Sequence, residues 1–483
     1  MAQQETLKQK TAWGLMWGGM STAAQQLLNL GFGIILARRL SQADYGMIGM
    51  LAIFSAIAAC MQEGGFIAAL NRKKEVTQRD YNAVFWTSVL TSIFFYVLFW
   101  LCAPLIARFY DEPRLTSLAR YSFLSFLFVS FSIAPRAYIF KNMMVRQSSI
   151  ISLVALLLSG IVGVAMAYGG YAYWGLATQT IVYTLSVSIL NYWLSGWRPS
   201  LQIDLRPVGE LLGFSSRLIV TNILTAANTN LLSVLLGRYY TASEVGDFTQ
   251  ASKWNTMGHS LITGMLYSIA QPVLTKTDDD RQRQKQVFRK LLRFTAFVSF
   301  PLMLGLSLVS EEFIVLLITD KWLSSASLLR WLAVAGAVMP VSYLFSNLLI
   351  SRGRSRAYLW STTALLVGQL VVVGLCIPLG IGRMVQAFTV INIVWVAVWF
   401  LLARGEIGLR TTEVLSDVLP YALLALLAVG VACVVTLGMD SLLLSLVVKV
   451  LVVAALYPAA LWLMGSTILR ESLHFVTKLK IEN

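Results

Sequence analysis

One motif occurs twice in this chain, as LARRLSQADYG at residues 36–46 and as LGRYYTASEVG at residues 236–246. The leucine, the arginine and the final glycine are identical, and the acid two positions before the glycine is kept as Asp44 and Glu244. Self-similarity at a fixed offset indicates a duplicated structural unit.

A second set of matches supports the duplication. With an offset of 205 residues, Pro135, Tyr138, Phe140 and Asn142 recur as Pro340, Tyr343, Phe345 and Asn347. Between the two sets, Leu118, Arg120 and Tyr121 match Leu328, Arg330 and Trp331. Three matches in the same order predict a six-helix unit that is present twice. Because six is even, both copies enter the membrane in the same sense, and the pseudo-two-fold axis lies along the membrane normal.

Composition places the chain in a bilayer. Hydrophobic residues make up 57% of it and charged residues 13%, whereas soluble domains carry roughly 25% charged residues. One crossing takes about 20 apolar residues. Apolar stretches long enough to cross lie near 12–37, 46–70, 81–106, 116–140, 149–168, 171–194, 211–236, 246–274, 294–318, 326–350, 358–378, 381–403, 418–437 and 442–464. The sequence therefore predicts an all-α integral membrane protein with about fourteen transmembrane helices.

The expected organisation follows from the repeat. Residues 1–205 form an N-lobe of six helices, residues 206–405 form a C-lobe of six, and residues 406–483 carry two further helices and a tail. The first stretch is longer than the roughly 7–15 residues of a signal-peptide core, so we expect it to stay uncleaved. No loop is long enough for a soluble catalytic domain, which argues against an enzyme, and no phosphate-binding loop indicates nucleotide hydrolysis.

The positive charges predict the topology. With the N-terminus in the cytoplasm, 25 of the 38 Lys and Arg residues lie in cytoplasmic segments, 7 lie outside and 6 lie within spans. This asymmetry obeys the positive-inside rule and predicts that both termini are cytoplasmic. It also explains the net charge of +15 without a nucleic-acid partner. The four cysteines lie in apolar runs without metal-ligand spacing, and we expect no metal or other cofactor.

Polar residues recur every three or four positions within three predicted spans. Such side chains either make interhelical hydrogen bonds or line a water-filled cavity, because lipid cannot satisfy them. Both interpretations stay open here, although a polar helix face that is repeated in both lobes favours the lining of a cavity. The residues are Ser21, Gln25 and Asn29 in the first span, Thr221, Thr225 and Thr229 in the seventh, and Thr256, His259 and Ser260 in the eighth.

Charges inside the predicted spans are mostly positive. Arg217, Lys253 and Arg136 stand against Glu63, which is interpreted as the one carboxylate well inside a span. A basic cavity attracts an anion such as a phosphate or a uronate. Lys253 can instead snorkel to the interface, which is also the interpretation for Lys449, and His259 is either a packed histidine or a proton relay.

Glu63 has two interpretations. A lone carboxylate in a span titrates with conformation, which makes Glu63 the candidate for coupling to H⁺ or Na⁺. Alternatively it forms a static pair with an Arg or Lys in the membrane. The acids at 278–280 lie in a basic loop and are interpreted as a solvated charge cluster rather than metal ligands.

The motif at 36–46, followed by QEGGFIAALNRK at 62–73, resembles the polysaccharide-exporter branch of the multidrug/oligosaccharidyl-lipid/polysaccharide superfamily. Members carry leucine-alanine-arginine, a serine-proline-aspartate-tyrosine-glycine turn and an acid-glycine-leucine-glycine-alanine-leucine stretch. Here Gln42 and Ala43 replace the proline-acid portion of the turn, and Gly65 and Phe66 vary the second stretch.

This resemblance implies a flippase of the bacterial inner membrane. Its substrate would be an undecaprenyl-pyrophosphate-linked repeat unit of an exopolysaccharide such as colanic acid, which contains glucuronate. Its partners would be membrane lipids and the polymerase and chain-length proteins of the same pathway. In the related lipid II flippases two extra C-terminal helices form a lipid-accommodating groove, and residues 418–437 and 442–464 match those helices by position.

Two other functions compete with a flippase. A drug/cation antiporter of the same fold would need several carboxylates in its cavity. A membrane polymerase or ligase would need a sizeable outer loop with catalytic Arg or His, and the only histidines are His259 and His474. Transport by alternating access between the two lobes is the function that we expect.

Overall fold

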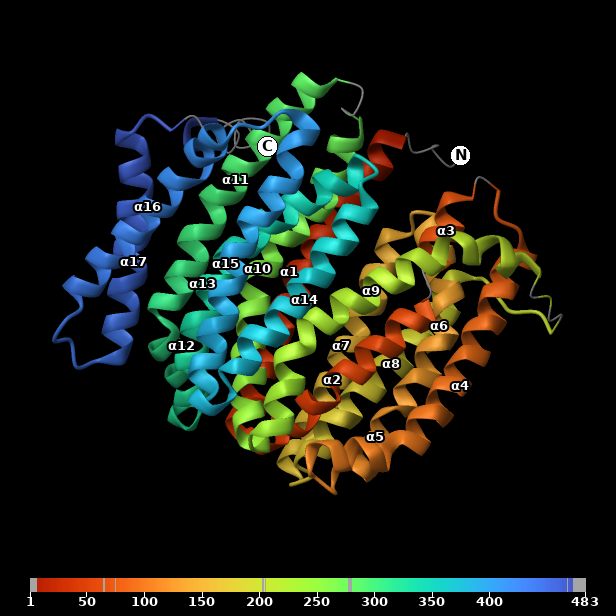
Figure 1. Ribbon diagram of the computed structural model, residues 1–483. Coiled ribbons are helices and arrows are strands. Elements are labelled where there is room, and N and C mark those ends of the chain that lie inside the picture. Colours follow the sequence, from red (N-terminus) through yellow and green to blue (C-terminus); the bar gives the residue numbers. More distant parts are fainter. Residues whose placement is uncertain are drawn as a thin grey trace. The chain divides into compact units, whose positions relative to one another are not determined.

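The structure is a computed structural model that describes residues 7–63, 66–73, 75–201, 204, 206–276, 280–466 and 468–471. Every regular element in these ranges is a helix, which confirms the predicted all-α class. Packing divides the chain into two compact units, residues 1–246 and 247–483. The helices are coloured along the sequence in Figure 1.

The first unit contains nine complete helices among the described residues and the start of a tenth. They are α1 (Leu7–Arg39), α2 (Gln42–Glu63), α3 (Phe66–Arg72), α4 (Gln78–Tyr110), α5 (Leu115–Ser122), α6 (Leu124–Lys141), α7 (Val145–Tyr168), α8 (Tyr173–Ser195), α9 (Arg206–Tyr239) and α10 (Ala242–Lys276). Its core joins α3, α4 and α6 through aromatic and alanine side chains such as Tyr81, Phe85 and Ala134. In lipid, such close packing of small and aromatic residues replaces the hydrophobic driving force.

The second unit begins inside α10. It contains α11 (Arg281–Leu308), α12 (Ser310–Ile318), η1 (Asp320–Trp322), α13 (Leu323–Ser351), α14 (Ser355–Leu375), η2 (Ile377–Leu379), α15 (Ile381–Ile407), α16 (Thr411–Val435) and α17 (Leu442–Leu463). One core cluster joins α10, α11, α13 and α15. A second joins α11 and α13 to α16 and α17, so the two C-terminal helices pack on the unit rather than lying apart from it.

The packing boundary at 246/247 differs from the boundary of the sequence repeat. Helix α9 belongs to the first unit because it packs against α2 and α4. The predicted lobes at 1–205 and 206–405 follow the repeat, and they stay a prediction.

Each of the fourteen predicted spans coincides with one helix or with two consecutive helices. Among the described residues, eleven segments are long and apolar enough to cross a membrane. The other three, α1, α8 and α10, contain 33, 23 and 35 residues. They have the length to cross, but polar side chains dilute their apolar character, as in α10 with Lys253, Asn255 and His259.

Three predicted spans are broken rather than continuous. The stretch 46–70 divides between α2 and α3, the stretch 116–140 divides at Phe123, and the stretch 294–318 divides at Val309. Hydropathy averaged over a window does not locate such breaks, because each lies within a stretch that is apolar on average. Gly170 lies in the turn between α7 and α8 and Gly380 lies directly before α15, and they adopt φ values of 80° and 91°, which favour glycine.

The repeated motif forms the same helix start twice. At α2 the backbone N–H of Ser41 donates to Asp44 Oδ2 (2.8 Å), and the Asp44 N–H donates to Ser41 Oγ (3.3 Å). At α10 the N–H of Thr241 donates to Glu244 Oε2 (3.0 Å), and the Glu244 N–H donates to Thr241 Oγ1 (3.4 Å). Both are capping boxes, which satisfy otherwise unpaired N–H groups. This chemistry explains why each copy keeps an acid at this position.

Removing the Ser41 hydroxyl tests this cap. We expect Ser41→Ala to lower the free energy of unfolding by about 1 kcal/mol, the usual value of an N-cap side chain. Thermal unfolding in detergent measures it. Ser117→Ala is the control, because the exposed Ser117 hydroxyl only donates to its own helix at the Arg114 carbonyl (3.2 Å). Equal midpoints for the two variants would contradict the assignment.

Hydrogen bonds of two asparagines and of Asp280 agree with the sequence repeat and with the interpretation of the acidic loop. Asn142 and Asn347, matched in the repeat, donate from Nδ2 to the carbonyls of Tyr138 (2.9 Å) and Tyr343 (2.8 Å), which is the same local hydrogen bond twice. Asp280 begins α11, and its Oδ1 accepts from the N–H groups of Gln282 (2.9 Å) and Arg283 (3.0 Å). Asp280 is therefore a helix cap, while Asp278 and Asp279 lie outside the described residues.

Candidate functional site

The polar residues of α1 and α9 make local hydrogen bonds. Gln25 donates from Nε2 to Ser21 Oγ (3.0 Å), one turn earlier on α1. Thr225 and Thr229 each donate to the carbonyl one turn earlier (2.9 Å), and both are exposed, as is Asn29. Because these bonds stay within one helix, they give no support to the interhelical interpretation. The cavity interpretation stays a prediction.

Glu63 pairs with Arg136. The distance from Arg136 Nη1 to Glu63 Oε1 is 3.1 Å, and the two side chains are 59% and 47% exposed. Of the two alternatives for Glu63, the structure contains the ion pair. The sequence analysis treated Glu63 and Arg136 separately, but they form one ion pair. Glu63 neutralises the charge of Arg136, so Arg136 cannot by itself make a basic site.

Lys253 differs from Arg136, because it has no acidic partner in the part of the chain that the structure describes. Within the described residues, the partly buried Lys253 makes no hydrogen bond or ion pair, and its Nζ lies 5.9 Å from the ring centroid of Trp254. An uncompensated cation away from water is costly unless an anion binds it. Of the cations proposed from the sequence whose side chains are described, Lys253 is therefore the one that fits an anion site.

Other polar groups of α10 lie around Lys253 in the sequence. Thr256 is exposed, and Ser260 donates to the Met257 carbonyl (3.0 Å). His259 Nδ1 is buried with no hydrogen-bond partner in the described structure, and the two interpretations of His259, a packed histidine or a proton relay, both stay open. The side chain of Arg217, the whole of His474 and the segment Gly64–Gly65 lie outside the described residues.

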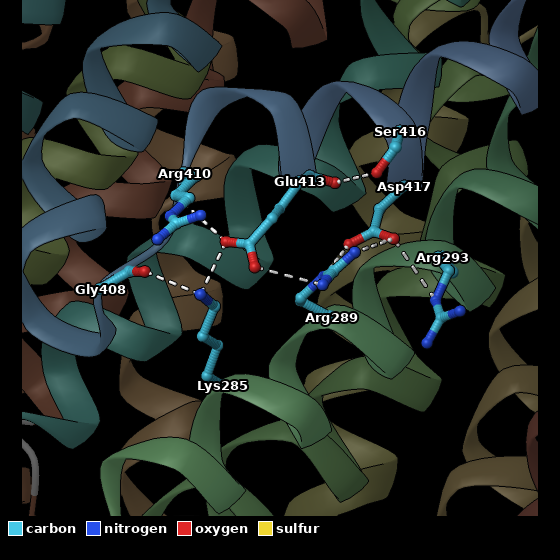
Figure 2. Close-up of polar contacts among 8 residues, drawn as sticks. All are labelled: Lys285, Arg289, Arg293, Gly408, Arg410, Glu413, Ser416 and Asp417. Atoms are coloured by element: carbon cyan, nitrogen blue, oxygen red, sulfur yellow. Dashed lines mark hydrogen bonds and ion pairs between the residues drawn. The ribbon is translucent and has the colours of Figure 1, made fainter.

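A charged cluster on α11 and α16 was not predicted. Figure 2 shows Lys285, Arg289 and Arg293, each one turn apart on α11, facing Glu413 and Asp417, one turn apart on α16. Arg289 donates from Nε (2.6 Å) and from Nη2 (3.1 Å) to the two oxygens of Asp417. Such a bidentate pair is among the strong charge-assisted hydrogen bonds.

The rest of the cluster surrounds this pair. Lys285 Nζ lies 2.7 Å from Glu413 Oε2, Arg289 Nη1 lies 3.3 Å from Glu413 Oε1, and Arg293 Nε lies 3.6 Å from Asp417 Oδ1. Asp417 is only 3% exposed. The sequence contains one signal of this cluster, because the cations of α11 and the acids of α16 both recur every four residues. That spacing alone does not indicate that α11 faces α16.

A second buried pair joins α12 to α17. Lys449 donates to Glu312 Oε1, which also accepts from Ser445 Oγ (2.9 Å). The side chains of Lys449 and Glu312 are 13% and 7% exposed. Two interpretations were therefore wrong. Lys449 does not snorkel but binds a carboxylate, and Glu63 is not the one carboxylate well inside a predicted span, because Glu312 lies in the stretch 294–318.

Between these two anchors lies an apolar groove. It has a volume of about 530 Å³, and its walls are α11 and α17. Among the described residues of its lining, Lys449 is the one that carries a charge, and the others are mostly aliphatic or aromatic: Phe297, Val298, Pro301, Leu302, Gly305, Leu306, Leu308, Val309, Val450, Val453, Ala454, Tyr457 and Pro458. Tyr457 donates across the inner wall to the Phe297 carbonyl (2.9 Å). Such a lining fits a hydrocarbon chain better than a sugar.

Comparison with known proteins finds curated relatives. Two curated relatives are the teichuronic acid biosynthesis protein TuaB of Bacillus subtilis and the lipopolysaccharide biosynthesis protein WzxC of Escherichia coli. TuaB is 23% identical over 394 residues, or 79% of this chain and 78% of its own. WzxC is 26% identical over 355 residues, or 72% of this chain and 71% of its own.

Solved structures share the fold. The lipid II flippase MurJ in an inward closed conformation superposes with a TM-score of 0.76 at 13% identity, covering 93% of this chain and 99% of that one. An inward-facing multidrug resistance MATE family transporter of the MOP superfamily gives a TM-score of 0.64 at 17% identity, covering 80% and 94%. The fold is therefore that of the MOP superfamily, the superfamily that the motifs indicated.

The profile of one family matches residues 35–327, more than half of the chain and including both copies of the repeated motif. This chain belongs to the polysaccharide biosynthesis protein family.

Proposed function

We propose that the protein is a flippase that carries an anionic, lipid-linked oligosaccharide to the outer leaflet of the bacterial inner membrane. The observation that carries this proposal is Lys253, a partly buried cation with no partner among the described residues. A pyrophosphate or a uronate would supply the missing negative charge, as an undecaprenyl-pyrophosphate-linked repeat unit does. An exopolysaccharide unit that contains glucuronate, such as that of colanic acid, carries both groups.

The polar and apolar surfaces suit the two ends of such a substrate. The exposed side chains of Asn29, Thr225 and Thr229 offer hydrogen bonds to sugar hydroxyls. The groove between α11 and α17 offers apolar surface to a prenyl chain. The family and the relatives named for teichuronic acid and lipopolysaccharide biosynthesis support this substrate class.

Coupling to an ion is part of the proposal. The Glu63–Arg136 pair is half exposed, so an anionic substrate can compete with Glu63 for Arg136. Glu63 released in this way can take up H⁺ or Na⁺. Transport would then proceed by alternating access of the two copies of the repeat.

The lipid-linked sugars of a deletion strain test the function. A flippase predicts that complete repeat units accumulate on the cytoplasmic leaflet. Single units on the outer leaflet would instead indicate a polymerase or ligase. Unchanged lipid-linked sugars, together with drug resistance on overexpression, would indicate an antiporter.

Replacing Lys253 tests the anion site. We expect Lys253→Met to lower polymer export about tenfold, because a charge-assisted contact of about 1.5–3 kcal/mol is lost. Lys253→Arg keeps the charge and is the matched control, which we expect to retain most of the export. Both variants are quantified in the membrane before export is measured. Wild-type export by Lys253→Met would overturn the role of Lys253.

A further inference from the structure

A second apolar groove lies between α6 and α8, which pack against each other within the first unit (Figure 1). Its volume is about 330 Å³, near the lower end of the roughly 300–1,000 Å³ that is usual for ligand pockets. Aromatic rings dominate its lining, which includes Phe128, Phe131, Tyr192 and Trp193 beside Ile189 and Ser188. The Ser188 hydroxyl already donates to the Phe128 carbonyl. The groove therefore offers mainly hydrocarbon contact.

One end of this groove lies at the predicted cytoplasmic side. Tyr192 and Trp193 lie in the last turn of α8, which ends at Ser195, and Ser188 lies on the order of 10 Å deeper at 1.5 Å per residue. Tyrosine and tryptophan favour the level of the lipid headgroups, and Trp193 is exposed. On the predicted topology, the groove thus extends from headgroup level into the hydrocarbon of the cytoplasmic leaflet.

Arg198 lies at this end of the groove. Its Cζ is 4.5 Å from the ring centroid of Tyr192, a cation–π contact that orients the guanidinium group. Its Nη1 donates to the Tyr192 carbonyl and, at 2.9 Å, to the Trp197 carbonyl. Among the residues that the structure describes, no carboxylate pairs with Arg198, and its Nε and Nη2 make no hydrogen bond. The groove therefore has an uncompensated cation at its headgroup end.

The backbone around Arg198 is held in place. Trp197, directly before it, is buried in the core that joins α3, α4 and α6. Gln78 Nε2 donates to the Arg198 carbonyl (2.7 Å), and the Ser200 N–H donates to Asn82 Oδ1 (2.9 Å). A cation on a fixed segment loses little conformational freedom when it binds an anion.

We propose that this groove binds an anionic phospholipid of the cytoplasmic leaflet, such as phosphatidylglycerol. Its phosphate contacts Arg198, and one acyl chain lies between α6 and α8. Basic pockets between transmembrane helices on the cytoplasmic side bind anionic headgroups, and the planar guanidinium group matches a phosphate. The groove between α11 and α17 differs, because Lys449 in its lining is bound to Glu312.

Lipid titration of the protein in detergent, followed by native mass spectrometry, tests the charge. We expect phosphatidylglycerol to bind the wild type about tenfold more tightly than phosphatidylcholine with the same chains, because charge-assisted hydrogen bonds form. Arg198→Gln should lose this preference, and Arg198→Lys should keep part of it. Arg146→Gln is the matched control, since Arg146 is also exposed at the predicted cytoplasmic side and stacks on Trp17 (5.7 Å). An equal loss in Arg146→Gln would overturn the proposal.

A phosphatidylglycerol with a photoreactive group in its acyl chain tests where the chain lies. We expect the label on the α6 peptide that contains Phe131. Ile189→Trp, which fills the groove, should abolish most of this labelling. Ile161→Trp on α7 is the matched control, because Ile161 is exposed but does not line the groove. Label found only on other helices, or equal labelling in the two tryptophan variants, would overturn the proposal.

Competition distinguishes the phospholipid from a carrier lipid. Excess unlabelled phosphatidylglycerol should remove the label from the Phe131 peptide, whereas the same concentration of undecaprenyl phosphate should not. Displacement by undecaprenyl phosphate would assign the groove to a carrier lipid and overturn the proposal. Unfolding midpoints without lipid show that Arg198→Gln and Ile189→Trp are folded. The inference does not depend on the transported molecule, which the lipid-linked sugars of the deletion strain report separately.

Discussion

Asp417→Asn is expected to lower the free energy of unfolding by about 3 kcal/mol, at the low end of the usual cost of breaking a buried ion pair from one side. The substitution removes the carboxylate that binds Arg289 through two hydrogen bonds and approaches Arg293 (Figure 2). The two guanidinium groups then lie between helices with less negative charge. Thermal and denaturant unfolding in detergent measure the effect.

A nearby exposed pair supplies the control. Lys290 Nζ lies 2.6 Å from Glu471 Oε2, and this hydrogen bond holds the pKa of the Glu471 carboxyl below its ordinary value. Because both groups are exposed, Glu471→Gln should leave the unfolding midpoint unchanged. An apolar pair, Asp417→Leu with Arg289→Met, should recover much of the lost stability, since it leaves neither group unpaired. If Asp417→Asn unfolds like Glu471→Gln, the buried cluster does not anchor α16.

Lys449→Met is expected to cost a similar amount, about 3 kcal/mol, because it leaves the Glu312 carboxylate buried without its cation. Ser445 remains as a donor to Glu312 Oε1 (2.9 Å), and Glu312 Oε2 has no hydrogen-bond partner in the described structure. Since Lys449 also lines the groove, export should fall together with stability. The unfolding midpoint and the export rate are measured on the same variant.

The double variant Glu312→Gln with Lys449→Met distinguishes the loss of the ion pair from a change in the groove lining. It removes both charges, so stability should return close to the wild-type value. Glu311→Gln is the control, because Arg330 Nη2 and Glu311 Oε2 are 3.7 Å apart and both side chains are exposed, which predicts a change below about 1 kcal/mol. A double variant that is no more stable than Lys449→Met would show that Lys449 does not act through Glu312.

Together the two buried pairs explain how the C-terminal helices can border a groove. Asp417 holds α16 to the first turns of α11, and Glu312 holds α17 where α12 follows α11. With α16 held near the start of α11 and α17 held near its end, α11 and α17 leave an apolar groove between them. The ion pairs of Asp417 and Glu312 thus hold the helices that border the groove, and both pairs lie beyond the apolar surface that a hydrocarbon chain would contact.

Much of the fold could be predicted from local patterns. Hydropathy located fourteen stretches that coincide with helices, and the repeated acids at Asp44 and Glu244 mark two capping boxes. Prediction failed where a break falls inside a stretch that is apolar on average, as at Phe123 and Val309. Hydropathy averages over a window, so a change of helix direction within apolar sequence leaves no signal.

The candidate site was predicted less well. The sequence treated Glu63 and Arg136 separately, although they form one ion pair, and it assigned Lys449 to the interface, although it binds Glu312. Lys253 was named from the sequence, and the structure adds that it has no acidic partner among the described residues. Whether a charge in a span is compensated depends on helices distant in sequence.

The sequence by itself determined the membrane class, the duplication, the helix starts and the family, because these depend on residues close together in the chain or on motifs read directly. Only the tertiary structure decided which charges are paired, where the groove lies and why the motif ends in glycine. Those features join residues about 70 to 200 positions apart, and a pattern along one helix does not specify which helix packs against it. Gly46 and Gly246 illustrate both: the repeat revealed them, and the contact between the first turns of α2 and α10 showed that no larger residue fits.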